Sequence, residues 1–202
     1  MLSRIADNLF WMSRYLERAN STSRLIGINL VHMVETEDAL PEAAQWRPML
    51  SITGNEANFG ALHPGGEIRA EAAIDYLTRE PGNPSSVLNC LRLARENARI
   101  VRDRLSKEMW ESLNDFWHRI DGRLKRQLPL GAWPEFHKFV RDEVALFHGL
   151  ALNTMMRGEA FDFYQIGTFL ERADMTARIL DVKYHLLLPD VSMVGSALDY
   201  YQ

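Results

Sequence analysis

A ten-residue motif occurs twice in the chain, with its two copies 154 residues apart. Residues 16–25 read LERANSTSRL and residues 170–179 read LERADMTARI, so six of the ten positions are identical. In each copy an Arg directly follows a Glu, and a second Arg lies seven residues after that Glu. Residues seven apart lie two turns along an α-helix on nearly the same line. Each copy therefore predicts a carboxylate and two guanidinium groups on adjoining stripes of a helix.

The first copy lies in a stretch with the spacing of a long buried helix, expected over about residues 3–35. Residues recur here at alternating intervals of three and four, as in a heptad seam. The seam consists of Leu2, Ile5, Leu9, Met12, Leu16, Ala19, Ser23, Ile26, Leu30 and Met33. A second apolar set covers other sides of the helix and consists of Phe10, Trp11, Tyr15, Leu25, Ile28 and Val31. A helix that is apolar on several sides is buried on several sides, so we expect it at the centre of a bundle.

The second copy lies in a helix expected over about residues 159–188, ending before Pro189. Its expected buried seam consists of Phe163, Ile166, Leu170, Ala173, Ala177, Leu180, Tyr184 and Leu187. Further helices are expected over about 46–52, 67–79 and 135–155, and over a long stretch that begins after Ser85 or Ser86 and bends or restarts near Ser106. Residues 54–66 are expected to form a loop. No segment alternates like a strand, so the sequence predicts an all-α fold. We expect a bundle of long antiparallel helices with an internal pseudo-repeat, in a single domain over residues 1–202.

The charged residues of the two motifs and of one related segment are the candidate site residues. They are Glu17, Arg18, Arg24, Arg95, Glu96, Arg99, Arg102, Glu171, Arg172, Asp174 and Arg178. Their apolar flanks suggest that three helices offer Glu and Arg to one interior. Buried charges must pair, either with each other or with a ligand. Two interpretations follow: an ion network that fixes helix register, or a site where Arg forks bind a carboxylate-bearing peptide.

The repeat also predicts which charges meet. If the two motif helices face each other about a pseudo-twofold axis, Glu17 lies near Arg172 or Arg178. By the same symmetry, Glu171 lies near Arg18 or Arg24. These pairs would join residues more than 150 positions apart in the sequence.

Composition narrows the class of protein. The net charge is −4, which argues against bulk electrostatic binding of nucleic acid or of an anionic membrane. No apolar run approaches the length of a membrane span. Cys90 is the only cysteine, so no intrachain disulfide can form, and we expect a cytoplasmic protein in which Cys90 is a small core residue. No glycine-rich phosphate loop and no Glu-x-x-His pair occurs, so no metal and no cofactor is expected, and no catalytic residue is assigned.

Several segments together resemble bacterial Alpha-E domain proteins across nearly the whole chain. These segments are residues 1–19 (MLSRIADNLFWMSRYLERA), 83–86 (NPSS), 94–99 (ARENAR), 106–114 (SKEMWESLN) and 170–178 (LERADMTAR). The resemblance implies an all-helical protein whose characteristic glutamate corresponds to Glu17 and Glu171. It also implies further helices after residue 202, so we expect the domain to lack a C-terminal continuation. At Asn20 the chain has an amide where the resemblance leads us to expect an acid.

Members of this family tend to be encoded beside ATP-grasp-type ligases and transglutaminase-like peptidases. The resemblance therefore implies an accessory protein of a peptide amide-ligase system, with one of these enzymes as its protein partner; a peptide and a second copy of the chain are further candidate partners. One alternative is an enzyme of the same system that uses Glu17 or Glu171 as general acid/base. A carboxylate beside two Arg has a depressed pKa, which favours the accessory role. The other alternative is a purely structural oligomerisation module.

Overall fold

The computed structural model describes residues 1–35, 41–125 and 128–182, and within these ranges the fold is all-α with no strand. The predicted fold class is therefore confirmed. The α-helices are α1 (Ser3–Glu35), α2 (Glu42–Ile52), α3 (Glu56–Leu62), α4 (Ala70–Arg79), α5 (Val87–Ile100), α6 (Lys107–Leu124), α7 (Trp133–Thr154) and α8 (Glu159–Val182). Short 3-10 turns at Arg102–Arg104 and Leu130–Ala132 precede α6 and α7.

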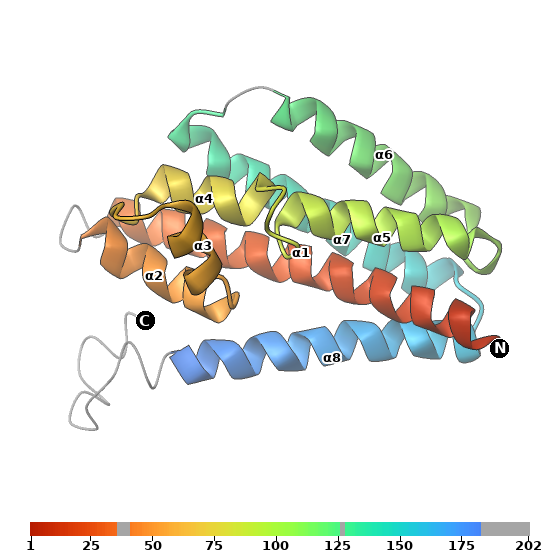
Figure 1. The fold of residues 1–202 in the computed structure, drawn as a ribbon. Coiled ribbons are helices and arrows are strands. Elements are labelled where there is room, and N and C mark those ends of the chain that lie inside the picture. Colours follow the sequence, from red (N-terminus) through yellow and green to blue (C-terminus); the bar gives the residue numbers. More distant parts are fainter. Residues whose placement is uncertain (36–40, 126–127, 183–202) are drawn as a thin grey trace.

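The longest helix, α1, is the central element of the bundle (Figure 1). It packs against α5, α7 and α8, while α6 covers α5 and α7 from the outer side. Its predicted seam is buried from Leu9 to Leu30, with Leu9, Met12 and Leu16 fully enclosed. Leu2 is exposed at the end of the seam. The prediction that α1 is buried on several sides is wrong for Ile28 and Val31 of its second apolar set, which are 59% and 52% exposed.

Capping residues set the boundary between α5 and α6. Ser86 caps α5 by accepting a hydrogen bond from the Asn89 backbone N–H at 3.4 Å. Ser106 caps α6 in the same way, accepting from the Met109 N–H at 3.2 Å. Each side chain satisfies a backbone donor that has no partner within the helix. The predicted cap near Ser86 and the predicted restart near Ser106 are both confirmed.

The expected loop over residues 54–66 contains a helix, α3, and that expectation is wrong. This helix is held by Phe59, which is buried and meets the Tyr76 ring edge-on at 5.3 Å between centroids. A helix of seven residues that buries one side chain gives no periodic pattern in the sequence. Its stability comes from this tertiary contact, which sequence spacing does not reveal.

The orientation of α8 is the largest departure from expectation. The seam predicted to be buried is exposed: Ile166, Leu170 and Leu180 have 51%, 47% and 49% of their surface accessible. Phe163, Ala173 and Ala177 are exposed as well, while Tyr184 and Leu187 lie outside the described residues. The buried side consists of Phe161, Tyr164, Gly167, Thr168, Glu171, Met175 and Val182. The side that carries the motif carboxylate therefore faces α1, and the heptad seam faces away.

Gly167 makes this orientation possible, because it lies at the closest approach of α8 to α1. A Cβ at this position would overlap the Ser13 hydroxyl and the Phe10 backbone carbonyl. Only a residue without a side chain allows the two backbones to come so close. The contact fixes both the spacing of α1 and α8 and the side of α8 that faces inward.

Gly167→Ala should therefore lower the free energy of unfolding by about 1–3 kcal/mol, because backbone atoms must move to admit the methyl group. Gly149→Ala is the matched control, since Gly149 lies inside α7 and a Cβ there meets no atom within 4 Å. That control should raise stability by about 0.5–1 kcal/mol through helix propensity. Urea unfolding of both variants measures the difference, and equal effects would contradict the close approach.

Candidate functional site

The carboxylate of Glu17 lies at the junction of α1, α7 and α8, with its side chain only 4% exposed. Arg172 of α8 donates to it twice, from Nε to Oε1 at 2.9 Å and from Nη2 to Oε2 at 3.2 Å. His148 of α7 lies with Nε2 at 2.9 Å from Oε2. The amide of Asn20 donates to Oε1 at 3.3 Å. An amide at position 20, where an acid was expected, thus adds a donor rather than a second negative charge.

The carboxylate of Glu171 is enclosed in the same way from the opposite helix, and its side chain is 1% exposed. Arg18 donates from Nε to Oε1 at 2.6 Å and from Nη2 to Oε2 at 3.0 Å. Arg14 donates from Nε to Oε2 at 2.7 Å. Both contacts therefore come from α1. We call Glu17, Arg172, Glu171, Arg18, Arg14 and His148 the Glu/Arg cluster.

The two motif copies exchange partners across the α1–α8 contact. Glu17 of the first copy binds Arg172 of the second, and Glu171 of the second binds Arg18 of the first. Both pairs are two-pronged, which is the strongest geometry for a guanidinium and a carboxylate. The reciprocal pairs are among those that the repeat predicts.

Aromatic rings of α1 support the guanidinium groups from behind. The Arg14 guanidinium lies 5.1 Å from the ring centroid of Trp11 and 5.6 Å from that of Phe10. The Arg18 guanidinium lies 5.9 Å from the Tyr15 centroid. Cation–π attraction and the flat ring faces restrict where these guanidinium groups can point.

The charged forms of Glu17, Arg18 and Arg172 are strongly favoured at neutral pH. Burial by itself would raise the pKa of Glu17, but hydrogen bonds from His148 and Arg172 outweigh it and lower that pKa to about 2. Burial by itself would lower the pKa of Arg18, but its hydrogen bond to Glu171 reverses the effect and raises that pKa. The hydrogen bond to Glu17 raises the pKa of Arg172. Glu17 is therefore poorly matched to proton transfer near pH 7, which needs a pKa near that value.

Tyr164 extends the cluster beyond the ion pairs. Its hydroxyl hydrogen-bonds to Nδ1 of His148, and burial is the main reason that its pKa is raised. A phenol that keeps its proton can donate to Nδ1, which leaves Nε2–H of His148 to donate to Glu17. Sequence analysis missed His148, Arg14 and Tyr164. The spacing of Arg14, one helical turn before Arg18, could have indicated its role. No feature of the sequence indicates the role of His148, which lies 131 residues from Glu17.

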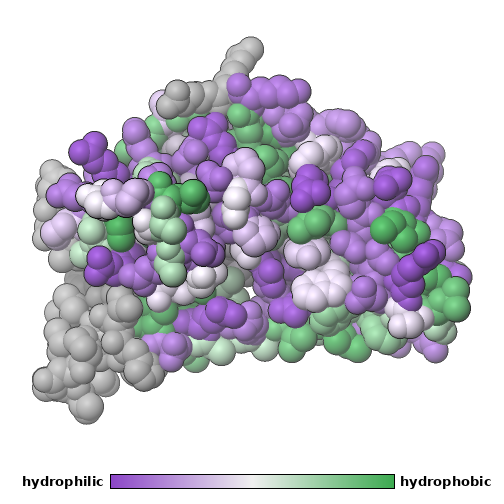
Figure 2. Space-filling model, viewed as in Figure 1, coloured by the Kyte–Doolittle hydropathy of each residue, from purple (hydrophilic) through white to green (hydrophobic). Residues whose placement is uncertain are grey.

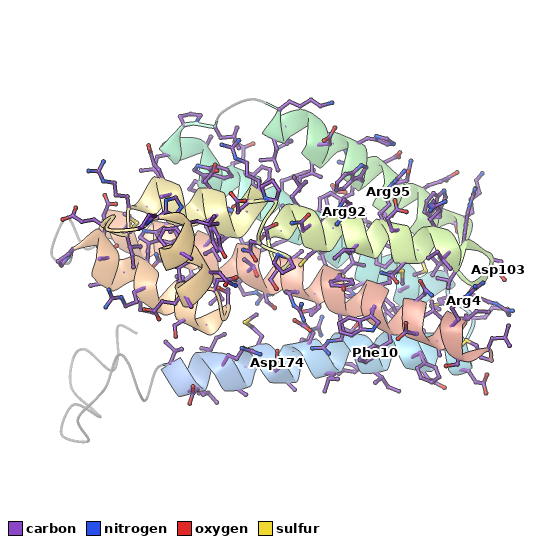
Figure 3. All side chains as sticks on the ribbon, viewed as in Figure 1. Arg4, Phe10, Arg92, Arg95, Asp103 and Asp174 are labelled. Carbon is purple, nitrogen blue, oxygen red and sulfur yellow. The ribbon has the colours of Figure 1, made fainter. Side chains whose placement is uncertain are left out.

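The remaining candidate residues lie elsewhere. Arg24 is exposed on α1, and Arg178 pairs with Asp174 at 3.1 Å within α8, where the Arg178 guanidinium lies close to Gly54. Figure 3 shows Asp174 on α8 and Arg95 on α5, at different sides of the bundle.

The expectation that the third charged segment shares an interior with the two motifs is wrong. Its charged side chains contact α5 itself and the neighbouring α6. Arg95 donates to the Asn114 side chain of α6 at 2.8 Å, and Arg99 pairs with Glu96 of α5 at 3.0 Å. Arg102 lies 5.2 Å from the Trp110 ring centroid. The buried stripe of α5 is Val87, Cys90, Leu91, Ala94 and Ala98, so these charges project from its partly exposed sides.

Other parts of the described chain offer little for chemistry. Among the described residues, no group of three or more His, Cys, Asp or Glu side chains is placed to hold a metal ion. Cys90 is a core residue as expected, and burial raises its pKa to about 12. A cavity of about 560 Å³ opens at one end of the bundle, lined by residues 103–106, 154–160 and Met1, and no candidate site residue lines it. No helix in the described ranges is long and apolar enough to cross a membrane.

Fold and cluster together define a helical-bundle protein whose paired Glu-Arg motifs join two helices. The sequence matches the Alpha-E family over residues 1–202, a family described as a predicted alpha-helical domain with a conserved ER motif, and the chain belongs to it. Glu17-Arg18 and Glu171-Arg172 are Glu-Arg pairs of that kind.

The curated relatives are mycobacterial and uncharacterised. One protein of Mycobacterium bovis is 29% identical over 117 residues, a match that covers 53% of this chain and 13% of that protein. A protein of Mycobacterium tuberculosis strain H37Rv is 28% identical over the same length and share. The match thus spans only about an eighth of the length of these relatives. No solved structure matches the sequence.

The cluster predicts unequal roles for two arginines of α8 that are equally exposed. Arg172 and Arg178 each have 48% of their side chain accessible, but Arg172 binds a buried carboxylate and Arg178 a partly exposed one. Arg172→Gln should lower the free energy of unfolding by about 2–3 kcal/mol, because Glu17 loses its main charge partner. Arg178→Gln, the matched control, should cost less than about 0.5 kcal/mol. Urea unfolding at neutral pH measures both, and similar losses would contradict the assignment.

Acid should remove the contribution of Glu17 to stability. The pKa of this carboxyl is lowered from 4.5 to about 2, so its contribution is fully present above pH 4.5 and is lost as pH falls toward 2. The shift corresponds to on the order of 3 kcal/mol. Between pH 5 and pH 2.5, wild type should therefore lose more stability than Glu17→Gln, measured by urea unfolding at each pH. Parallel curves would contradict the shift, and Asp174→Asn, at the surface of α8, serves as control and should follow wild type.

Proposed function

We propose that this chain is a helical accessory protein of a bacterial peptide amide-ligase system, with an ATP-grasp-type ligase or a transglutaminase-like peptidase as its protein partner. In this role the Glu/Arg cluster fixes the packing of α8 on α1. The observation that carries the proposal is that both motif carboxylates are almost fully buried and each is held by a two-pronged arginine from the facing helix.

The cluster is better suited to packing than to binding a peptide carboxylate. The Nε–Nη2 forks of Arg18 and Arg172 are both occupied by glutamates of the chain itself. A peptide carboxylate would have to displace a buried glutamate, which would leave that glutamate without its charge partner at a cost of several kcal/mol. Register fixing therefore explains the geometry with fewer assumptions.

The enzyme alternative, with Glu17 or Glu171 as general acid/base, has less support. Substrate must reach within hydrogen-bond distance of a catalytic carboxyl, and the two side chains are 4% and 1% exposed. The pKa of Glu17, held near 2 against the effect of burial, keeps it ionised and weakly basic. An accessory protein that only binds a partner needs neither a carboxyl that substrate can reach nor one whose pKa lies near 7.

The mycobacterial relatives fit an accessory role. Each matches this chain over a small part of a much longer protein, so a helical segment of this type occurs beside other segments in one chain. The other alternative, a structural oligomerisation module, is favoured by one specific observation, the outward apolar seam of α8. A chain that associates with its own copies can also bind a ligase as an accessory protein.

Co-purification tests the accessory role. The tagged chain, co-expressed with the ATP-grasp-type ligase encoded beside a gene of this family, should retain that ligase through affinity and size-exclusion steps. Glu171→Gln should reduce the retained ligase several-fold, because Arg14 and Arg18 would then face each other without a carboxylate and α8 would dock loosely. Asp174→Asn, a surface change on the same helix, should retain it fully.

Two outcomes would contradict the proposal. If neither the ligase nor the peptidase binds the wild-type chain, the proposed protein partner is wrong. ATP-dependent amide formation by the purified chain alone would make it the enzyme instead of the accessory.

A further inference from the structure

The outward side of α8 carries a continuous apolar stripe, which we call the α8 seam. It consists of Phe163, Ile166, Leu170, Ala173, Ala177 and Leu180. Its four large side chains are 37–51% exposed, and Phe169 beside them is 55% exposed. In Figure 1, α8 lies at the edge of the bundle, with α1 on its inner side. Figure 2 shows hydrophobic surface along the lower edge of the molecule, where α8 runs.

The spacing of the α8 seam is that of a helix with a second helix against it. Its members follow one another at intervals of three, four, three, four and three residues, and no charged residue interrupts the line. This 3.5-residue period belongs to helices that pack side by side over several turns. Scattered exposed apolar residues are ordinary on a protein surface, whereas a contiguous stripe marks an interaction surface.

We propose that the α8 seam packs against the α8 seam of a second copy of the chain, in an antiparallel pair related by a twofold axis. An axis midway between Leu170 and Ala173 makes the seam self-complementary. Leu170 then lies opposite the partner's Ala173, and Ile166 lies opposite the partner's Ala177. Large side chains meet small ones in these central layers, so the two helices can approach closely there, while Phe163 lies opposite the partner's Leu180 at each end of the seam.

The parallel arrangement fits less well. It would place Leu170 against the partner's Leu170 and Ala173 against the partner's Ala173, so that three layers of paired large side chains are followed by two layers that hold only alanines. Close packing along the whole seam is then lost. The sequence of large and small residues therefore selects the antiparallel pair, in which each patch meets its own copy as twofold symmetry requires.

The exposed area is sufficient for a dimer of modest affinity. Large apolar side chains of about 200 Å² that are 37–55% exposed each offer roughly 100 Å². Together with Phe169 and the two alanines, the four large side chains of the α8 seam offer on the order of 500–600 Å² per copy, hence about 1,000–1,200 Å² for the pair. This is the lower end of the range for specific interfaces. The dimer should therefore dissociate on dilution rather than be permanent.

Sedimentation velocity across a concentration series tests the proposal. Wild type should shift from monomer to dimer with rising concentration, over roughly 1–100 µM. Leu170→Glu should remain monomeric throughout, because it places a carboxylate in the centre of the seam. Leu146→Glu is the matched control: Leu146 lies on α7 with 50% exposure against 47% for Leu170, and this variant should dimerise as wild type does. Circular dichroism confirms that both variants are folded.

Cysteine cross-linking tests the register. In the antiparallel pair, position 166 lies opposite the partner's position 177, whereas two copies of position 166 lie about 16 Å apart along the helix. That separation is too long for a disulfide. Ile166→Cys mixed with Ala177→Cys should therefore cross-link under mild oxidation, while each variant alone should not. The single native cysteine, Cys90, is buried and should not interfere.

Three results would overturn the proposal. Wild type that stays monomeric up to about 100 µM would mean that no second copy binds the α8 seam. Cross-linking of either cysteine variant with itself would mean a parallel pair. Dimerisation that Leu146→Glu abolishes and Leu170→Glu does not would place the interface elsewhere. None of these results bears on ligase binding, so the proposed function is tested separately.

Discussion

The interaction on which the rest of the structure depends is the burial of two carboxylates between arginine forks at the contact of α1 and α8. Glu17 and Glu171 are almost completely removed from water, and each is paired from the facing helix. A buried carboxylate without its partners costs several kcal/mol, so any rotation or one-turn slip of α8 would leave both unpaired at once. Alternative packings of α8 are therefore penalised.

This constraint explains why α8 faces α1 with its more polar side. Glu171, Gly167 and Thr168 lie on the inward side, where Gly167 lets the backbones approach closely enough for the two-pronged pairs to form. The heptad seam occupies the opposite side of the helix, and both sides cannot face α1 together. The polar side is inward because exposing apolar side chains costs less than burying these charges without partners. The exposed seam follows from the ion pairs.

The sequence predicted those features of the fold that depend on residue identity and spacing. It did not predict contacts that depend on where a further helix lies in space. The all-α class, the central α1, the restart at Ser106 and the reciprocal partners of Glu17 and Glu171 could all be predicted. The orientation of α8 could not, because a 3.5-residue period indicates that a seam is buried somewhere but not by which molecule. His148 reaches Glu17 because α7 packs beside α1. The short helix α3 is held in place because its Phe59 packs against the ring of Tyr76. Neither contact leaves a local pattern.

The two sides of α8 make different kinds of contact: the inward side determines how α8 packs on α1, and the outward side offers apolar surface for association. The inward side defines one position on α1 through directional, charge-assisted contacts, which discriminate strongly between registers. The outward side offers apolar area, which favours association but discriminates weakly between partners. Because both sides belong to one helix, the ion pairs that place the inward side on α1 also determine that the apolar seam faces away from the bundle. The duplicated Glu-Arg motif thereby links the interior of the bundle to the surface that the bundle presents.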